Sequence, residues 1–281
     1  MEIVNSLSGI RQLIHKIKLQ RKTLGFVPTM GALHNGHLEL VRNSINQNDV
    51  TMCSIFVNPS QFNNPEDLIN YPRDTEADIS KLKSLECDAV FIPPANAMYS
   101  EQSTLNFDFG YLETIMEGKF RPGHFKGVGL IIAKLFNLME PDRAYFGEKD
   151  LQQFAIIKKL ATELFFNVEI ISVPTVREEN GLAMSSRNKL LSETDRAHAS
   201  DLINALTIAQ KKLIKGETVV SVKKYVIDLF ETESKIKLEY FEIVRTTDLQ
   251  NISQIKDHFD VSLCIAGYLG KVRLIDNISL N

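Results

Sequence analysis

The feature of this sequence that most constrains its fold is an alternation of two kinds of segment over roughly its first 175 residues. Short runs rich in apolar and β-branched residues read as strands: Thr23–Val27, Val50–Val57, Ala89–Ile92, Asp142–Phe146 and Val168–Val173. Between and around them, apolar residues recur at helical spacing in the segments Ile3–Ile17, His37–Ile45, Asp74–Leu85, Val128–Leu138 and Asp150–Phe165. Strands that alternate with helices favour βαβ units. The pattern therefore predicts an α/β fold with a parallel sheet.

The composition changes after about residue 175. A polar segment, Arg177–Asn188, is followed by a long predicted helix that begins after Ser192 and ends near Lys215, and by a second helix, Ser221–Glu233. Three strand-like runs close the chain: Tyr240–Val244, Val261–Tyr268 and Val272–Ile275. Helices followed by clustered strands indicate a separate, smaller α+β domain. We therefore predict domains at residues 1–175 and 176–281.

Composition excludes several classes of function. The chain has 281 residues, a formal net charge of −3 and a charged fraction of 24%, so a nucleic-acid partner is not expected. Its three cysteines, Cys53, Cys87 and Cys264, imply no disulfide framework and are expected to be small buried side chains. Neither a signal-peptide core nor an apolar stretch of about 18 residues occurs. We expect a cytoplasmic protein without a membrane partner.

The first chemical motif is Pro28-Thr-Met-Gly-Ala-Leu-His-Asn-Gly-His37, which follows the first predicted strand and opens a helix. Gly31 and Gly36 allow a tight turn, and a helix N-terminus after such a turn suits a phosphate group. His34 and His37 lie three residues apart, so both rings could donate hydrogen bonds to phosphoryl oxygens. The spacing alone leaves two alternatives open, which are surface histidines on a plain turn and half of a metal site.

A second motif, Phe56-Val-Asn-Pro-Ser-Gln-Phe62, follows the next strand. Asn58 and Gln61 are neutral groups that could hold a hydroxy acid, although a plain turn built on Pro59 explains the same residues. In a third motif, Phe146-Gly-Glu-Lys-Asp-Leu-Gln-Gln153, a lysine opens a helix and offers a compact charge for phosphate. A solvated first turn is its alternative.

A fourth motif, Met184-Ser-Ser-Arg-Asn188, places two hydroxyls and a guanidinium in a short polar loop, where they could bind phosphate or form a charged linker. The fifth motif is Arg121-Pro-Gly-His124. A structural role and a functional role of Arg121 and His124 agree equally well with the sequence. Arg273-Leu-Ile-Asp-Asn277 lies near the end of the chain.

Together these motifs carry a resemblance. His-x-Gly-His after a strand resembles the signature of the nucleotidylyltransferase superfamily, which includes class I aminoacyl-tRNA synthetases. The longer string from Phe26 to His37, with the other motifs in order, is similar to the pantothenate synthetase (pantoate–β-alanine ligase) family. The resemblance implies a Rossmann-like N-terminal domain that binds nucleotide and pantoate, and a C-terminal domain that acts as a lid.

The resemblance also implies roles for individual residues. His34, His37 and Lys149 are the expected catalytic residues, and Gln61, Gln153 and Asn58 the pantoate-binding ones, with Gln61 also contacting β-alanine. Val176 and Met184 are expected near the adenine. The expected ATP-binding residues are Met30, Gly31, Ala32, Leu33, His34, Asn35, Gly36, His37, Gly147, Glu148, Lys149, Asp150, Val176, Met184, Ser185, Ser186 and Arg187. Asp78 resembles a family position near the metal, and Mg²⁺ is expected mainly on the ATP phosphates.

The implied reaction joins (R)-pantoate to β-alanine through pantoyl adenylate and releases AMP and pyrophosphate, a step toward coenzyme A. A homodimer is also implied. Two other hypotheses remain. One is a nucleotidylyltransferase with a different small acceptor, although Gln61 and Gln153 offer neutral contacts where a phosphorylated acceptor would need cations. The other is a non-catalytic module that binds nucleotide or RNA. The near-neutral charge argues against RNA, and the His and Lys set argues against a silent sensor.

Overall fold

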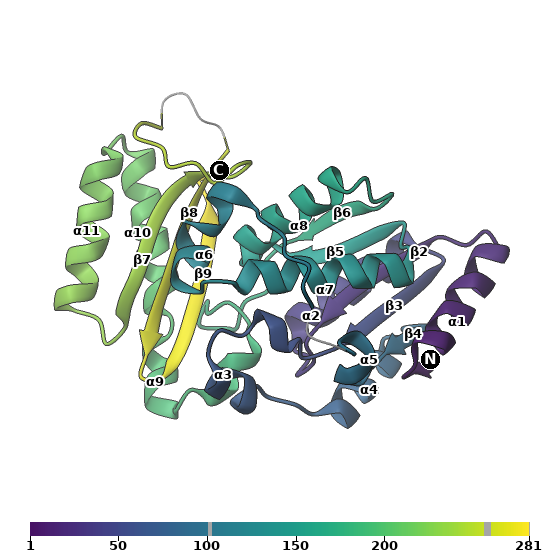
Figure 1. Cartoon of the computed structure of the whole chain (residues 1–281). Helices are drawn as coiled ribbons and strands as arrows, with labels where there is room; N and C mark the ends of the chain where they lie inside the picture. Colours follow the sequence, from purple (N-terminus) through teal and green to yellow (C-terminus); the bar gives the residue numbers. More distant parts are fainter. Residues whose placement is uncertain (101–102, 256–259, 281) are drawn as a thin grey trace. The chain divides into compact units, whose positions relative to one another are not determined.

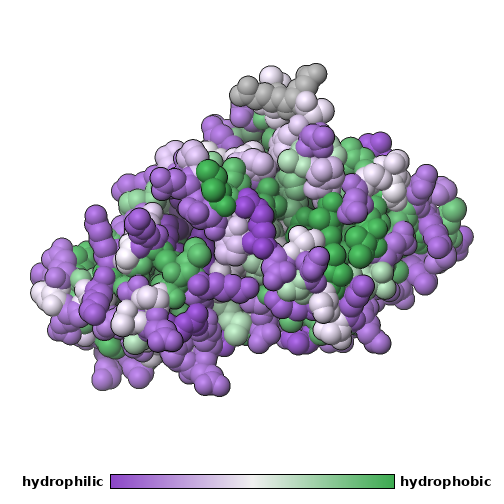
Figure 2. Space-filling model, turned by 90° about the horizontal axis from the view of Figure 1, so that it is seen from below, coloured by the Kyte–Doolittle hydropathy of each residue, from purple (hydrophilic) through white to green (hydrophobic). Residues whose placement is uncertain are grey.

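The computed structural model describes residues 1–100, 103–255 and 260–280, and it divides into two compact units, Met1–Pro174 and Thr175–Asn281 (Figure 1). Within these described ranges, no helix is both long and apolar enough to cross a membrane. The face shown in Figure 2 is largely hydrophilic, with hydrophobic residues in separate patches. Each unit is described below by itself.

The first unit is built on one sheet of six parallel strands in the order β1-β4-β3-β2-β5-β6. The strands are β1 (Glu2–Val4), β2 (Leu24–Thr29), β3 (Val50–Ile55), β4 (Ala89–Phe91), β5 (Arg143–Gly147) and β6 (Glu169–Val173). This confirms the predicted parallel sheet. The prediction of a helix from Ile3 was wrong at its start, because Ile3 pairs with Val90 of β4 and the helix begins only after Ser6.

Helices cover both faces of this sheet. They are α1 (Leu7–Leu19), α2 (Asn35–Gln47), α3 (Pro65–Asn70), α4 (Thr75–Ser84), α5 (Ala95–Met98), α6 (Met116–Phe120), α7 (His124–Met139) and α8 (Leu151–Glu163). Shorter 3₁₀ turns are η1 (Pro59–Gln61), η2 (Gly110–Glu113) and η3 (Glu148–Asp150). Phe26 of β2 packs with α1, α7 and α8, whereas the next residue, Val27, packs with α2 and α4. Successive residues of the strand thus point into two different apolar cores, one on each face of the sheet.

Strand β2 runs through Pro28 to Thr29, so the prediction that it ends before Pro28 was wrong. The Leu24 carbonyl accepts a hydrogen bond from Asp142 N at 2.9 Å, on the β5 side. Residues an even number apart on a strand face the same neighbour, so Pro28 also faces β5. Pairing with β5 ends at Phe26. The missing N–H of the proline therefore removes no ladder bond.

The chain reverses direction across the sheet between β2 and β5. From β2 the connections run outward to β3 and β4, and later to the opposite side through β5 and β6. Open α/β sheets bind ligands outside the carboxyl ends of their strands at such a point. The segment after β2 carries Met30–His34, and the segment after β5 is Glu148–Asp150. The fold therefore brings two of the sequence motifs to the position where a ligand is expected.

The second unit contains an antiparallel sheet in the order β7-β8-β9, with α10 and α11 packed on it (Figure 1). Its elements are η4 (Ser186–Leu190), α9 (Glu193–His198), α10 (Asp201–Ile214), α11 (Val219–Thr232), β7 (Lys237–Arg245), β8 (Val261–Leu269) and β9 (Val272–Ser279). This confirms the predicted α+β class. The single helix predicted after Ser192 is two helices, separated by a turn at Ala199 and Ser200 whose backbone angles stay in the right-handed helical region.

Candidate active site

The turn after β2 places two consecutive residues in the left-handed region, Gly31 with φ 81° and Ala32 with φ 50°. Glycine adopts this region freely, whereas alanine does so at a cost of about 1 kcal/mol or more. Asp78 of α4 offsets that cost. One of its oxygens accepts from Ala32 N and the other from Leu33 N, both at 2.7 Å. Since Asp78 is only 1% exposed, these charge-assisted bonds hold the turn in place.

Two further side chains support the same turn. Lys81, one turn after Asp78 on α4, donates to the Leu33 carbonyl at 2.6 Å. Thr29 Oγ1 accepts from Gly31 N at 3.1 Å and donates to the Ser54 carbonyl of β3 at 2.8 Å. The backbone that follows β2 is therefore fixed from both α4 and β3. The N–H groups of Gly31, Ala32 and Leu33 are therefore used to fix the turn itself at the carboxyl end of β2.

Asp78 is expected from the resemblance to lie near a metal. In the structure both of its carboxylate oxygens bind backbone N–H groups of the turn. Among the residues described, no group of three or more His, Cys, Asp or Glu side chains could hold a metal ion. A metal contact of Asp78 stays a prediction, and its structural contacts are those of a support for the turn.

The two histidines of the first motif lie together at the start of α2. His34 caps the helix, its Nδ1 accepting from Gly36 N at 3.2 Å, and His37 Nδ1 accepts from His34 N at 3.4 Å. Their ring centroids are 4.0 Å apart. A neutral imidazole whose Nδ1 accepts a hydrogen bond carries its proton on Nε2. Both rings therefore present an Nε2–H donor.

The electrostatics of His37 keep it neutral. Burial lowers its pKa from 6.5 to about 4, and the charges of Lys149 and Lys81 act in the same direction. Lys149 comes from the segment after β5 and is half-buried. The motifs that follow β2 and β5 are thus close enough to interact. At neutral pH they offer a cation beside a neutral donor, a combination suited to phosphate.

The remaining positions of the third motif continue from the same strand end. Glu148 accepts a hydrogen bond from Ser172 Oγ of β6 at 3.2 Å. Asp150 ends the 3₁₀ turn η3, and α8 begins at Leu151, so the predicted helix start is one residue early. Gln153 is half-buried in the first turn of α8. Lys149 lies in η3, and Asp150, with non-helical backbone angles of φ −95° and ψ 54°, separates it from the helix that carries Gln153.

The second motif meets the first through Gln61. Asn58 and Gln61 are 1% and 7% exposed. The Asn58 amide donates to Gln61 Oε1 at 3.0 Å, and Gln61 Nε2 donates to the sulfur of Met30 at 3.1 Å. The polar residues after β3 are therefore held beside the turn after β2, as the parallel sheet leads one to expect.

The fifth motif, Arg121–His124, for which the sequence left a structural and a functional role open, makes specific contacts in the structure. His124 is buried, and its Nδ1 lies 2.8 Å from the Gln61 carbonyl oxygen, so the imidazole N–H donates to it. Arg121 forms an ion pair with Glu117 at 3.5 Å. The structure thus gives His124 a part in holding the Gln61 backbone, whereas the ion pair between Arg121 and Glu117 is local to α6.

Some residues at this site were not singled out from the sequence. Lys81 and Tyr99 are the main ones, and both act through contacts with residues about 40 or more positions away. Lys81 had a usable signal, since it lies one turn after Asp78 on the same helix face. Tyr99 belongs to none of the sequence motifs and had no such signal.

In the second unit, residues expected near ATP form a short hairpin. Met184 N donates to the Val176 carbonyl at 3.0 Å, and Arg177 pairs with Ala183 in an antiparallel bridge. The two residues expected beside the adenine are therefore neighbours. Ser185 Oγ accepts from Arg187 N at 3.3 Å, and Ser186 is buried. The loop that follows the hairpin is ordered as η4.

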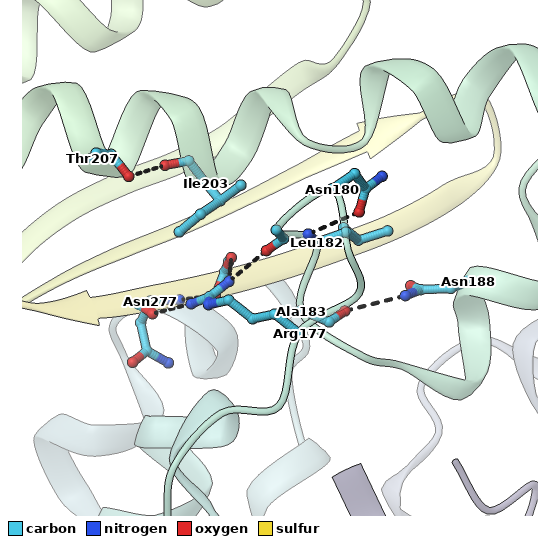
Figure 3. Close-up of polar contacts among 10 residues, drawn as sticks. Arg177, Asn180, Leu182, Ala183, Asn188, Ile203, Thr207 and Asn277 are labelled. Carbon is cyan, nitrogen blue, oxygen red and sulfur yellow. Dashed lines mark hydrogen bonds and ion pairs between the residues drawn. The ribbon is translucent and has the colours of Figure 1, made fainter. Parts of the chain in front are cut away.

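This hairpin is anchored to β9 by an ion pair between the half-buried Arg177 and the buried Asp276. Figure 3 shows Arg177 beside Asn277 of the same strand. Arg177 donates to both oxygens of Asp276 at 2.6 and 3.0 Å, and also to the carbonyls of Gly181 and Asn277. On the other side, Asn188 donates to the Ala183 carbonyl at 3.1 Å. Asp276 of the Arg273–Asn277 motif thus contributes the carboxylate that holds the hairpin preceding Ser185 and Ser186.

Comparison with known proteins gives a consistent result. The family model described as pantoate-beta-alanine ligase matches residues 2–279. The pantothenate synthetase of Bacteroides thetaiotaomicron is 44% identical over 278 residues, covering 99% of this chain and 98% of that protein. The corresponding protein of Cytophaga hutchinsonii is 43% identical over 277 residues, covering 97% and 98%.

Solved structures agree with these sequence relatives. The crystal structure of pantothenate synthetase from Thermus thermophilus has a TM-score of 0.93 and 38% identity, covering 100% of this chain and 99% of that one. The pantoate-beta-alanine ligase from Francisella tularensis, crystallised with beta-gamma ATP and beta-alanine, has a TM-score of 0.81 and 34% identity, covering 100% and 98%. Both resemble the chain over its whole length.

Proposed function

Since the chain belongs to the pantoate–β-alanine ligase family, we propose that it joins pantoate to β-alanine through a pantoyl adenylate, with ATP as co-substrate. Family membership supports the ATP-dependent ligation, and the ligase from Francisella tularensis was crystallised with an ATP compound and beta-alanine. The observation that carries the proposed mechanism is the neutral His37 next to Lys149 at the carboxyl ends of β2 and β5.

The proposed reaction has two steps. In the first, a carboxylate oxygen of pantoate attacks the α-phosphorus of ATP, the bond to the bridging oxygen breaks, and pyrophosphate leaves. In the second, the amine of β-alanine attacks the acyl carbon, loses a proton, and expels AMP as the carbon–oxygen bond breaks. The first step depends on alignment and on neutralising negative charge, more than on covalent catalysis by the protein.

His34, His37 and Lys149 are the catalytic residues in this proposal. The Nε2–H groups of the two histidines donate to phosphate oxygens whose charge increases as the α-phosphorus is attacked, and the Lys149 ammonium supplies positive charge. A donor that is neutral keeps the same protonation state through the reaction. The low pKa of His37 supports this role, because it excludes proton uptake by His37 near neutral pH.

The proposed ATP-binding segments are those that the sequence suggested. In the first unit they are Met30–His37, where Asp78 and Lys81 hold the turn, and Gly147–Asp150. In the second unit, Val176 and Met184 are assigned to the adenine, and Ser185, Ser186 and Arg187 to the phosphates. The hairpin contact between Val176 and Met184 supports a shared role for that pair.

The proposed pantoate-binding residues are Asn58, Gln61 and Gln153, with Gln61 also assigned to β-alanine. The amide of Gln61 points its nitrogen toward Met30. It can therefore donate to an oxygen of the hydroxy acid. Asn58 has its own amide engaged by neighbouring protein groups, which favours an indirect contribution to pantoate binding.

Mg²⁺ enters this proposal as part of the MgATP substrate. The described residues offer no cluster of three ligands for a resident ion, and Mg²⁺ is usually held through substrate phosphates together with one or two carboxylates. No step of the proposed mechanism is assigned to a protein-bound metal. A homodimer in the cytoplasm is likewise proposed from the family resemblance alone.

The experiment that tests the proposed function follows pyrophosphate and AMP from purified protein mixed with MgATP and pantoate, with and without β-alanine. Without β-alanine, pyrophosphate should appear as about one equivalent per active site. AMP should turn over only after β-alanine is added. Product formation that does not depend on pantoate would contradict the substrate assignment, and pyrophosphate release that requires β-alanine would contradict the separate adenylation step.

A further inference from the structure

Beside Gln61 lies a polar network that ends at the hydroxyl of the half-buried Tyr99. Tyr99 follows α5, about 40 residues from Gln61 in sequence. The network links Tyr99 to Asn58 and Asn58 to Gln61. Its consequence for the substrate rests on the proposed function of Gln61 in pantoate binding.

The orientation of the Asn58 amide is fixed by a backbone carbonyl. Asn58 Nδ2 lies 3.1 Å from the carbonyl oxygen of Gly127, at the start of α7. A carbonyl can only accept, so the group that faces it must be the NH₂ end of the amide. The contact is tight: a Cβ on Gly127 would stand 2.2 Å from the Ser60 carbonyl oxygen. Close packing of η1 on α7 therefore keeps Asn58 in this orientation.

The other end of the Asn58 amide then accepts from hydroxyl groups. Its Oδ1 lies 2.7 Å from the Tyr99 hydroxyl and 2.9 Å from Ser60 Oγ. Burial raises the pKa of Tyr99, so the phenol keeps its proton and can donate. The ring is held by stacking on Phe56 and by the Lys134 ammonium, 4.1 Å from the ring centroid. Tyr99 is thus a fixed donor to Asn58.

The same logic sets the orientation of Gln61. Because Asn58 donates through Nδ2, the atom of Gln61 that faces it at 3.0 Å must be the acceptor Oε1. The NH₂ group of Gln61 is therefore turned the other way, toward Met30 Sδ at 3.1 Å. A thioether is a weak acceptor. Gln61 consequently presents N–H donors, and a substrate group that binds it must be an oxygen acceptor, such as a hydroxyl or a carboxylate.

We propose that Tyr99 is a positioning residue for substrate recognition, which acts through Asn58 to hold the Gln61 amide with its donors toward the pantoate oxygens. Tyr99 does not touch the substrate in this proposal. Without this hydroxyl, Asn58 loses its shortest hydrogen bond and keeps only those with Ser60, Gly127 and Gln61, so the orientation that Asn58 imposes on the Gln61 amide is weakened. The effect of losing Tyr99 is then confined to the hydroxy acid.

The test compares steady-state kinetics of the wild-type protein and Tyr99→Phe. The KM for pantoate should rise about five- to tenfold, on the scale of one buried hydrogen bond, while the KM for ATP stays within about twofold of the wild-type value. Tyr145→Phe is the matched control, because it removes a buried hydroxyl that bonds Asn48 and Gln47 instead. An unchanged KM for pantoate in Tyr99→Phe would overturn the proposal.

A double-variant comparison separates positioning from a general loss of stability. Pantoate binding is measured by calorimetry for Gln61→Ala and for Gln61→Ala combined with Tyr99→Phe. If Tyr99 acts through Gln61, the second substitution changes the affinity by less than about twofold in this background. Losses that multiply would show that Tyr99 acts independently of Gln61, and the proposal would fall.

The wild-type assay distinguishes this inference from the function on which it rests. If the wild-type protein forms no pantothenate from pantoate, β-alanine and MgATP, the proposed function fails, and the inference fails with it. If the wild-type protein is active and the Tyr99→Phe variant keeps its pantoate KM, the proposed function stands and only the role of Tyr99 is refuted.

Discussion

His37 combines two properties that a free histidine does not have together: it is neutral near physiological pH with a wide margin, and it lies close to two lysines. Burial and the charges of Lys149 and Lys81 lower its pKa to about 4, and the His34 backbone N–H binds its Nδ1. The local chain therefore fixes both its charge and its tautomer. The ring atom of His37 that can donate a hydrogen bond to a ligand is therefore Nε2.

Replacing His37 by alanine should lower the rate of adenylation by about 10²-fold or more, the scale of removing one transition-state donor. The rate is measured as the burst of pyrophosphate in rapid-quench experiments with MgATP and pantoate. His15→Ala, on the exposed face of α1, is the control and should keep the wild-type burst. A folded His37→Ala variant with an unchanged burst would remove His37 from the mechanism.

The same residue predicts a pH dependence of stability. The pKa of His37 in the folded chain, about 4, lies below its ordinary value of 6.5, so between these values the unfolded chain binds a proton that the folded chain does not. The contribution of a neutral His37 is therefore complete above pH 6.5 and is lost progressively as the pH falls toward 4.

Urea unfolding at a series of pH values checks this dependence. The free energy of unfolding of the wild-type protein should fall more steeply between pH 6.5 and 4 than that of His37→Gln, whose side chain does not titrate. The difference between the two proteins should level off above pH 6.5. Parallel curves across the whole range would contradict the lowered pKa.

At the scale of single residues, the sequence identifies candidate functional residues better than it predicts which residues they contact. The pairing of Lys149 with the histidines follows from two motifs at the ends of neighbouring parallel strands, which can be anticipated. Asp78 and Tyr99 could not be assigned their contacts in advance, because each depends on how a connecting segment packs back against the sheet. Local spacing carries no information about such long-range approaches.

Among the secondary-structure elements, α4 stabilises the turn after β2 through hydrogen bonds of Asp78 and Lys81 with its backbone. In Asp78→Asn, one of the two backbone N–H groups would face an NH₂ donor. We expect a loss of about 1–3 kcal/mol in the free energy of unfolding, together with a raised KM for ATP. Chemical denaturation and kinetics measure the two effects.

Glu76→Gln provides the control for this substitution. It makes the same change from carboxylate to amide on the same helix, at an exposed position, and should alter neither property appreciably. An Asp78→Asn variant as stable as the wild-type protein would show that the turn holds its left-handed residues without help from α4.

In the second unit, the contact between the hairpin and β9 depends on the two-pronged geometry of Arg177 and Asp276. A lysine cannot reproduce it, so Arg177→Lys should destabilise this unit by about 1–3 kcal/mol. Arg245→Lys, at a more exposed pair with Asp248, should lower the stability less. Urea unfolding followed by circular dichroism compares them, and equal midpoints would contradict the prediction.

Elements were predictable wherever periodicity persisted for several residues. The short strand β1 was missed because its three residues merge with the apolar pattern of α1. The end of β2 was misjudged because a proline usually stops a strand, and only the early end of pairing with β5 makes it acceptable here. The break between α9 and α10 has no glycine or proline to mark it.

At the scale of the whole molecule, the chain holds separate apolar cores. The residues of two clusters all precede Pro174, and those of a third all follow Thr175. Each unit therefore buries its own hydrophobic residues. An expressed fragment of residues 175–281 should fold alone and unfold cooperatively in urea, as judged by circular dichroism. A fragment with the spectrum of a random coil would show that this core depends on the rest of the chain.

The place of β1 in the sheet has a consequence for how the chain is made. Its residues are synthesised before those of β2 and β3, yet the strand with which they pair is β4, at Ala89–Phe91. Until β4 has been synthesised, β1 lacks this partner, and the central strands β2 and β3 can associate before it. Strand β1 is thus made before the central pair β2 and β3 but can join the sheet only after them.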